Sequence, residues 1–297
     1  MKDFRFFGRI LLPIIWALAL GLPAPRPASA AVAGEKLKPE EVVSKHLDSI
    51  GAKEARDSVT SRVIVGTCKY SYRARGVGQT TGRVVLASEG EKSLIGMEFP
   101  EADYPHERLG FDGRKFSTGY IRPGTRTVFG DFLYGHSDVF REGLIGGTLN
   151  QAWPLANLAA RNAKLEYAGG GKVNGKEVHV LRYLPKKGSD FQIKLYFDAA
   201  TFQHVRSEYE QVISAGLGRT DKDSAGQRAS SYKIVEDFSD HRKEGGLVLP
   251  HTYKIRFLAD DRASAREMDW VIDFAQYGFN GQIPAGSFDV ESFKTGS

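Results

Sequence analysis

The chain has 297 residues and a formal net charge of +5, from 41 basic and 36 acidic residues. This length is sufficient for one large domain with its own core. The basic residues are scattered among acidic ones and no aromatic-studded basic run occurs, which argues against a nucleic-acid-binding role. Cys68 is the only cysteine, so no internal disulfide can form. We expect Cys68 to fill space inside the fold rather than to act as a reactive thiol.

The first 30 residues are typical of a secretory signal peptide. A positively charged start precedes an apolar segment at 10–22, and Ala28, Ser29 and Ala30 offer a small-residue cleavage site. The apolar segment is short for a membrane span, although an uncleaved anchor is the alternative. We expect cleavage after Ala30, with Ala33 as the second choice. The exported protein would then comprise residues 31–297, in the periplasm or secreted.

The exported chain is expected to begin with a helix at 38–51 and a short helical turn at 53–58. Pro39 suits a first helical turn and Gly51 is a natural stop. From residue 60 onwards, alternation of apolar and polar residues predicts antiparallel strands. Asp112 and Gly113 form the strongest hairpin signal among them. The strands predicted in this half span residues 61–72, 79–88, 93–99, 107–111 and 115–121.

An insert at 127–161 switches to helical spacing. Ser137 or Asp138 can cap one of its helices, and a short bent helix is expected at 150–160. An apolar insert of this kind has to cover something, and the apolar face of the sheet is the simplest candidate. The residues that can share its apolar face are Phe129, Leu133, Phe140, Leu144 and Ile145.

The second half returns to strands, and its clearest unit is a hairpin at 190–212. Asp198 begins the turn, because a short carboxylate can accept hydrogen bonds from the backbone just ahead of it. In the second strand, Val205, Ser207 and Tyr209 are expected on one face. The remaining strands are predicted at 164–168, 178–184, 230–237, 247–259 and 268–276, with a turn at 169–171 and a mobile loop at 214–228.

About ten strands joined mostly by short loops predict a single antiparallel sheet that is strongly curved. The predicted fold is α+β, a half-barrel with helices packed on its concave face, within one domain over 31–297. A β-sandwich is the alternative that periodicity alone leaves open. In the strand at 230–237, Tyr232 and Ile234 are expected to lie on one side of the sheet, together with Phe238 just after it.

The order of these elements resembles the bacterial lipoprotein-carrier superfamily of LolA-, LolB- and LppX-like sorting proteins. Three motifs carry the resemblance: the strand–turn–strand around Asp198, the glycine-rich start of a late strand at 244–251, and the closing pattern Phe279-Asn280…Ile283-Pro284…Phe288. It covers most of residues 36–293. The resemblance implies an open antiparallel half-barrel with helices against its concave face, and an apolar cavity that holds an acyl chain.

An apolar groove alone would give useful affinity for such a chain, because each buried methylene group is worth ~0.8 kcal/mol. The expected partners are a lipid or an acylated protein, with an envelope protein and a membrane surface as further contacts, and the protein is expected to be a monomer. The same side chains could instead form core beneath the helices. The candidate groove residues are Ile95, Met97, Phe99, Leu109, Phe111, Leu195, Phe197, Tyr253, Ile255, Trp270, Ile272 and Phe274.

Catalytic, metal and cofactor motifs are missing from the sequence. The seven histidines show no metal-ligand spacing, and no nucleophile elbow, phosphate loop or dinucleotide fingerprint occurs. His136 and Asp138 are the one candidate acid–base pair. We therefore predict a non-catalytic binding protein without a cofactor, which holds a lipid, a lipoprotein acyl chain or another amphiphile. The alternatives are an envelope hydrolase whose site assembles only in three dimensions, and a scaffold that binds a protein partner.

Overall fold

The computed structural model describes residues 37–74, 76–214, 229–261, 264–284 and 286–291. The signal peptide predicted at 1–30 and most of the loop predicted at 214–228 lie outside these residues. In the first half the chain forms α1 (Pro39–Ile50), α2 (Lys53–Asp57), β1 (Ser61–Arg73), β2 (Val77–Glu89), β3 (Lys92–Glu101), β4 (Tyr104–Phe111), β5 (Phe116–Thr118), β6 (Tyr120–Arg122) and β7 (Thr125–Arg126). Asp112 closes the turn between β4 and β5 by accepting two backbone N–H bonds of 2.7 Å.

The helical insert contains α3 (Val128–Gly135), α4 (Asp138–Arg141), α5 (Leu158–Arg161) and two 3₁₀ turns, η1 (Gly147–Leu149) and η2 (Pro154–Asn157). The second half adds β8 (Lys164–Val173), β9 (Lys176–Leu184), β10 (Gln192–Asp198), β11 (His204–Ile213), β12 (Ser230–Glu244), β13 (Leu247–Asp260) and β14 (Ala265–Phe279). None of the helices in the described part of the chain is long and apolar enough to cross a membrane.

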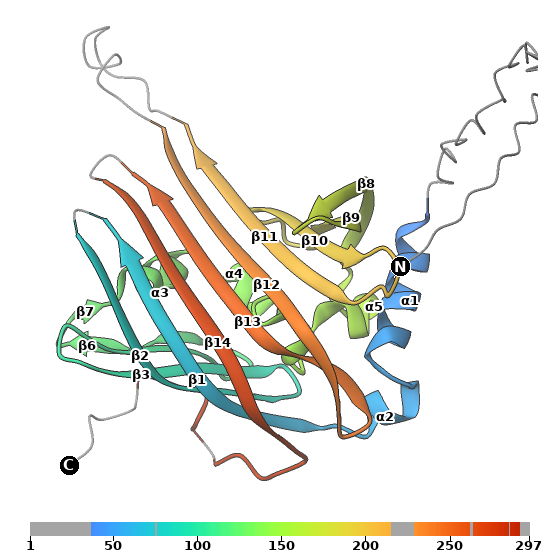
Figure 1. The fold of residues 1–297 in the computed structure, drawn as a ribbon, viewed down its shortest axis with the longest axis horizontal. Helices are drawn as coiled ribbons and strands as arrows, with labels where there is room; N and C mark the ends of the chain where they lie inside the picture. Colours follow the sequence, from blue (N-terminus) through green and yellow to red (C-terminus); the bar gives the residue numbers. More distant parts are fainter. Residues whose placement is uncertain (1–36, 75, 215–228, 262–263, 285, 292–297) are drawn as a thin grey trace, which may run out of the picture. The chain divides into compact units, whose positions relative to one another are not determined.

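Twelve strands form one antiparallel sheet, compared with about ten expected (Figure 1). Its order is β5-β4-β3-β2-β1-β14-β13-β12-β11-β10-β9-β8, and β6 and β7 form a separate pair. The pairing of β1 with β14 joins the two halves of the chain and places Tyr70 opposite Trp270. The edge strands β5 and β8 are not paired with each other, so the sheet is open. The main strands form one large sheet rather than the two stacked sheets of a β-sandwich.

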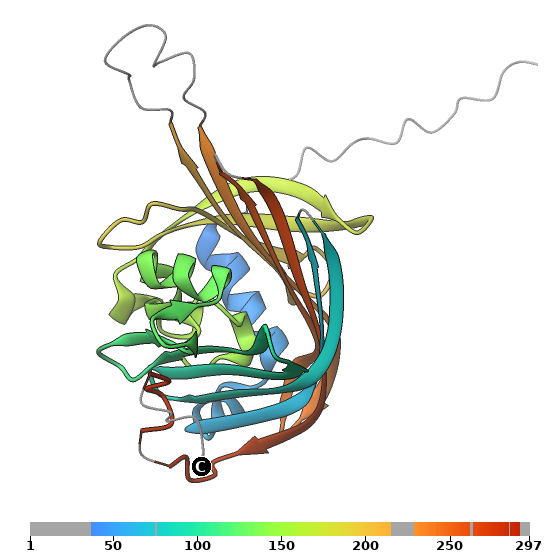
Figure 2. The same ribbon diagram turned by 90° about the vertical axis from the view of Figure 1, so that its left-hand side faces the viewer.

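Buried residues of the helical insert belong to the same apolar cluster as side chains of this sheet. Phe129, Leu133, Phe140, Leu144 and Ile145 are all buried in the same cluster as the strand side chains. Figure 2 shows the helices on the inner side of the curled sheet. We call this the inner side below, and the opposite face the outer side. Cys68 is also buried in the cluster, and burial raises the pKa of its thiol to about 12, which suits a structural role.

The hairpin of β10 and β11 forms as predicted around its turn. Asp198 accepts bonds of 2.9 Å from the backbone N–H groups of Ala200 and Thr201. However, Val205 does not share a face with Ser207. The pairing shifts register between Tyr196 and Phe197, and Val205 is the extra residue. It packs instead against a small separate cluster that contains Val173, Val178 and Val180.

Three other expectations are wrong. The segment 169–171 is not a turn but part of β8, where the strand is bulged and Gly169 adopts a φ of +100° that glycine tolerates. The strand expected at 115–121 divides at Gly119 into β5 and β6, which belong to different sheets. Ser137 precedes α4 but its side chain makes no capping hydrogen bond there.

Candidate functional site

The twelve candidate groove residues gather in one cluster on the inner side of the sheet. They come from β3, β4, β10, β13 and β14, and none is more than 7% exposed. All of them belong to the same connected core as the helical insert. The structure therefore brings the whole predicted set together. Their role in holding a ligand stays a prediction.

Helix α3 covers the part of this cluster around Trp270. The ring of Phe129 lies 4.9 Å from the ring of Trp270 and 5.3 Å from that of Phe257, measured between centroids. Leu133, one helical turn later, is fully buried, whereas the next residue, Tyr134, is 46% exposed. An eight-residue helix is not stable alone in water, so these contacts hold α3 in place.

A buried carboxyl group ties the start of α3 to the sheet. Thr127 caps the helix by accepting a hydrogen bond from the Gly130 N–H (2.8 Å), and its own hydroxyl donates to Glu107 on β4 (2.8 Å). Glu107 also accepts a bond of 3.0 Å from the Tyr104 hydroxyl, whose oxygen accepts from Nε1 of Trp270 at 3.0 Å. A continuous chain of hydrogen bonds therefore links α3 to a candidate groove residue.

Glu107 titrates in an unusual range because it is only 2% exposed. Burial raises the pKa of its carboxyl to about 7, although the hydrogen bonds from Thr127 and Tyr104 oppose this shift. Since the folded protein holds this proton more tightly than the unfolded chain, Glu107 lowers the stability of the fold as pH rises from about 4.5 through 7.

When the pH rises from 5 to 8, the free energy of unfolding should therefore fall less in Glu107→Gln than in the wild type. The two decreases should differ by up to ~3 kcal/mol. Urea unfolding at both pH values measures this difference. All other ionisable groups are the same in both proteins, so their contribution to the pH dependence cancels. Glu177→Gln, at a side chain that is 66% exposed, serves as the control and should follow the wild type. An equal pH slope for Glu107→Gln and the wild type would contradict the raised pKa.

A cavity of about 440 Å³ lies beside α3, between this helix and β12 and β13. One wall is aromatic: the ring centroid of Phe132 lies 4.8 Å from that of Tyr232, on which it stacks, and 4.8 Å from that of Phe257, to which it is tilted. Charged residues from several elements also line it, including the ion pair between Arg266 and Asp261. Because Phe257 also touches Phe129, the aromatic wall continues inward to the cluster around Trp270.

A second buried carboxyl group joins the helical insert to three strands. Glu236 on β12 accepts a 2.8 Å bond from the backbone N–H of Gly146, a 2.7 Å bond from the Tyr209 hydroxyl, and a bond from the Tyr253 hydroxyl. It is fully buried, and burial raises its pKa to about 7 despite these hydrogen bonds. Tyr253 is a candidate groove residue, so both buried carboxyl groups border the predicted site.

Sequence reasoning missed both carboxyl groups although a signal was present. Glu107 alternates with Leu109 and Phe111, which the same pattern placed in the groove. Glu236 stands between Ile234 and Phe238, in a row that was expected to face one side. A lone acid inside an apolar row of a strand predicts a buried carboxyl group with partners.

The other polar cluster lies inside the fold near α1. Trp153 Nε1 donates to His46 Nε2 at 3.0 Å, and His46 Nδ1 lies 3.0 Å from the backbone oxygen of Phe202. Burial lowers the pKa of His46 to about 4, so it is neutral at pH 7. His204 Nε2 lies 3.1 Å from the Ser207 hydroxyl, but both side chains are at most 1% exposed. A substrate cannot reach this serine in the structure.

His136 and Asp138 are not brought together as an acid–base pair. His136 lies 3.8 Å from the carboxylate of Asp190, whereas Asp138 accepts a hydrogen bond from Ser189. Among the described residues, no group of three or more His, Cys, Asp or Glu side chains is placed to hold a metal ion.

Comparisons with known proteins give structural matches only. No protein-family model and no curated protein matches the chain. It is similar to an outer membrane lipoprotein-sorting protein domain from Vibrio parahaemolyticus, with 11% identity, 84% of this chain and 96% of that chain covered, and a TM-score of 0.44. It is also similar to a LolA superfamily protein from Nitrosomonas europaea, with 13% identity, 85% of this chain and 97% of that chain covered, and a TM-score of 0.44. A third similar structure is a DUF1329 family protein from Desulfovibrio piger, with 13% identity, 84% of this chain and 96% of that chain covered, and a TM-score of 0.46.

The superfamily that the sequence motifs resemble is thus represented among the solved structures similar to this chain. These TM-scores are all below 0.5, and the function proposed next rests on the side chains of this chain.

Proposed function

We propose that this protein is an exported, non-catalytic binding protein that holds the hydrocarbon chain of an amphiphile between α3 and the inner side of the sheet. The observation that supports it best is the aromatic wall beside α3, which leads from an open cavity to the buried groove residues. In this proposal the curved sheet is a half-barrel with its helices on the concave face. Residues 1–30 are the signal peptide and 31–297 form the single domain.

Ligand binding requires α3 to move away from the sheet. The helix is short, and its first turn is held by Thr127 and Glu107 rather than by other helices. A hydrocarbon chain that replaces Phe129 over Trp270 keeps the inner side covered, because it substitutes one apolar contact for another. Each buried methylene contributes ~0.8 kcal/mol, so several of them offset the contacts that α3 gives up.

The ligand class follows from the shape and chemistry of the cavity. Aromatic side chains accept a hydrocarbon chain, and the charged residues at the rim meet a polar head that stays near water. A lipid, or the acylated end of a lipoprotein, combines such a hydrocarbon chain with a polar group. We infer further that the protein is a periplasmic or secreted monomer, which takes up its ligand at a membrane surface or from an envelope protein.

Native mass spectrometry tests this function. The full chain is exported from a bacterium, purified from the periplasm without detergent and extracted for lipid. We expect a chain that begins at Ala31 and carries a lipid, or that takes up added dodecanoate. Phe132→Glu, which puts a charge on the aromatic wall, should remove the lipid held beside α3 and so lower the amount of bound lipid. A wild-type protein that is free of lipid and also refuses added dodecanoate overturns the proposal.

The control is Tyr134→Glu on the same helix. Tyr134 is 46% exposed and does not line the cavity, so the same type of substitution there should leave lipid binding unchanged. Circular dichroism and urea unfolding confirm that both variants are folded. Equal loss of lipid in the two variants would point to a general effect on α3 rather than to the aromatic wall.

A further inference from the structure

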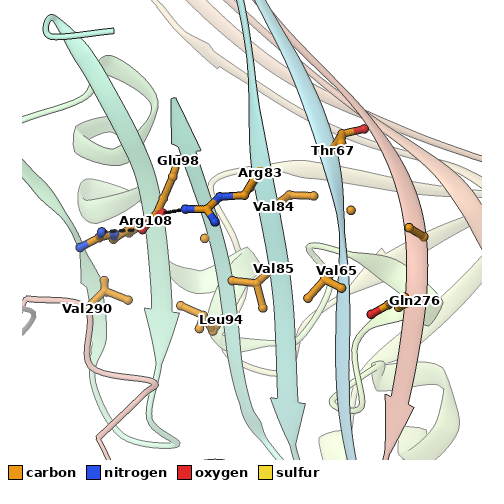
Figure 3. A pocket seen from close by; sticks show the side chains of 13 residues that line it. Val65, Thr67, Arg83, Val84, Val85, Leu94, Glu98, Arg108, Gln276 and Val290 are labelled. Atoms are coloured by element: carbon orange, nitrogen blue, oxygen red, sulfur yellow. Dashed lines mark hydrogen bonds and ion pairs between the residues drawn. The ribbon is translucent and has the colours of Figure 1, made fainter. Parts of the chain in front are cut away.

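A second and larger cavity, of about 720 Å³, lies on the outer side of the sheet (Figure 3). Its apolar floor includes Val65, Val85 and Leu94, which come from β1, β2 and β3. Val85 stands between Val84 and Leu86, which belong to the inner core, so its own side chain points to the opposite face. The groove runs from β4 across β3, β2 and β1 to β14, a span of about 19 Å at the usual strand spacing.

Two local features make this face hollow. The first is Gly96 on β3, where a Cβ would lie 3.2 Å from the side chain of Val85 and would narrow the groove. The second is the segment 286–291, which crosses the outer side of β4 and builds one wall with Val290. This crossing needs Gly110, because a Cβ there would lie 2.3 Å from the carbonyl oxygen of Phe288. The Val290 N–H donates to Ser117 at 3.0 Å and fixes the wall.

Arginine side chains also line the groove. Glu98 accepts hydrogen bonds from Arg83 at 3.4 Å and from Arg108 at 3.0 Å. The charged residues of the lining are therefore two guanidinium groups and one carboxylate. The Arg83 side chain is 86% exposed, so it can turn toward a ligand without disturbing the fold. The planar fork of a guanidinium group suits a carboxylate.

We propose that this groove binds a fatty acid, with the hydrocarbon chain along Val65, Val85 and Leu94 and the carboxylate at Arg83. The site is separate from the cavity beside α3. A hydrocarbon chain fits this face better than a peptide strand does, because β1, β2 and β3 are each paired on both sides. A peptide would find no free sheet edge to bond with and would leave its backbone groups unpaired, whereas a hydrocarbon chain has none.

Equilibrium dialysis with radiolabelled dodecanoate tests the groove. The exported protein carrying Phe132→Glu is used as the background, so that the cavity beside α3 does not contribute. We expect Val85→Glu to weaken dodecanoate binding at least ~10-fold, because it places a carboxylate on the apolar floor. Val77→Glu on the same strand is the control. Val77 is 78% exposed and lies outside the groove, so this change should have no effect.

The head group is tested by charge reversal. Arg83→Glu should weaken dodecanoate binding about 10-fold and strengthen the binding of dodecyltrimethylammonium, which has the same chain with a positive head. Arg73→Glu, at a side chain that is 71% exposed and away from the groove, is the control. Since Arg83 is mostly exposed, this variant folds even if Val85→Glu does not.

The proposal is overturned if the background protein binds no dodecanoate, or if Val85→Glu and Arg83→Glu both bind it normally. It is also overturned if the background protein, with Arg83 intact, binds dodecanoate and dodecyltrimethylammonium with equal affinity. These dialysis measurements do not depend on the site beside α3, because Phe132→Glu blocks that site in every variant. If Phe132→Glu leaves the amount of bound lipid unchanged while Val85→Glu removes it, the outer groove is the lipid site and the function proposed for α3 fails.

Discussion

Replacing Glu236 with alanine is expected to lower the free energy of unfolding by at least ~4 kcal/mol. The substitution leaves three buried donors without their acceptor: the Gly146 N–H and the hydroxyl groups of Tyr209 and Tyr253. It also opens a void where β11, β12 and β13 meet the helical insert. Urea unfolding at pH 6 measures the loss.

Glu236→Gln separates the hydrogen bonds from the charge. The amide oxygen can still accept from Gly146 and Tyr253, so we expect a loss of less than ~2 kcal/mol at pH 5. Burial raises the pKa of Glu236 to about 7, and the wild type therefore loses stability as pH rises through this value, whereas the glutamine variant does not. The difference in the free energy of unfolding between the wild type and Glu236→Gln should therefore shrink or reverse at pH 8.

Glu177→Ala is the matched control, because Glu177 is 66% exposed and forms only a surface ion pair with Lys172. Its loss should not exceed ~1 kcal/mol. If Glu236→Ala is no more destabilising than this control, the buried carboxyl group does not hold the insert to the sheet.

The strands could be predicted from the sequence because their signal is local. Leu249, Tyr253, Ile255 and Phe257 alternate with polar residues, and β13 buries them as this alternation requires. The bulges could not be predicted in the same way. Val205 is turned to the outer side by the pairing of β10 with β11, and an extra residue in one strand leaves no mark in that strand's own composition.

The inner site was predicted in part. Alternation placed Trp270 among the candidate groove residues, but it could not show that α3 lies on it, since this depends on contacts between segments more than a hundred residues apart. The outer groove was missed for a related reason. Val85 and Leu94 lie on the face of the sheet opposite the inner core, and the groove needs the remote residue Val290 to form its wall.

Phe129→Ala should produce the second large effect, a loss of ~3–5 kcal/mol in the free energy of unfolding. The phenyl ring is 1% exposed and lies between Trp270 and Phe257, so its removal leaves an apolar void beside the cavity at α3. In the proposed function this void is where a hydrocarbon chain goes. Added dodecanoate should therefore restore part of the lost stability, by an amount that grows with its concentration.

Phe116→Ala distinguishes this rescue from nonspecific stabilisation by the amphiphile. Phe116 is 4% exposed and packs on Phe140 of α4 at 4.8 Å, so its removal costs a similar amount but opens a void under a different helix. Unfolding of both variants is followed by tryptophan fluorescence with and without dodecanoate. A larger rescue of Phe129→Ala than of Phe116→Ala places the chain over Trp270 beneath α3, because the outer groove is intact in both variants and stabilises them equally. Equal rescue of both variants, or of neither, removes α3 as the cover of a ligand site.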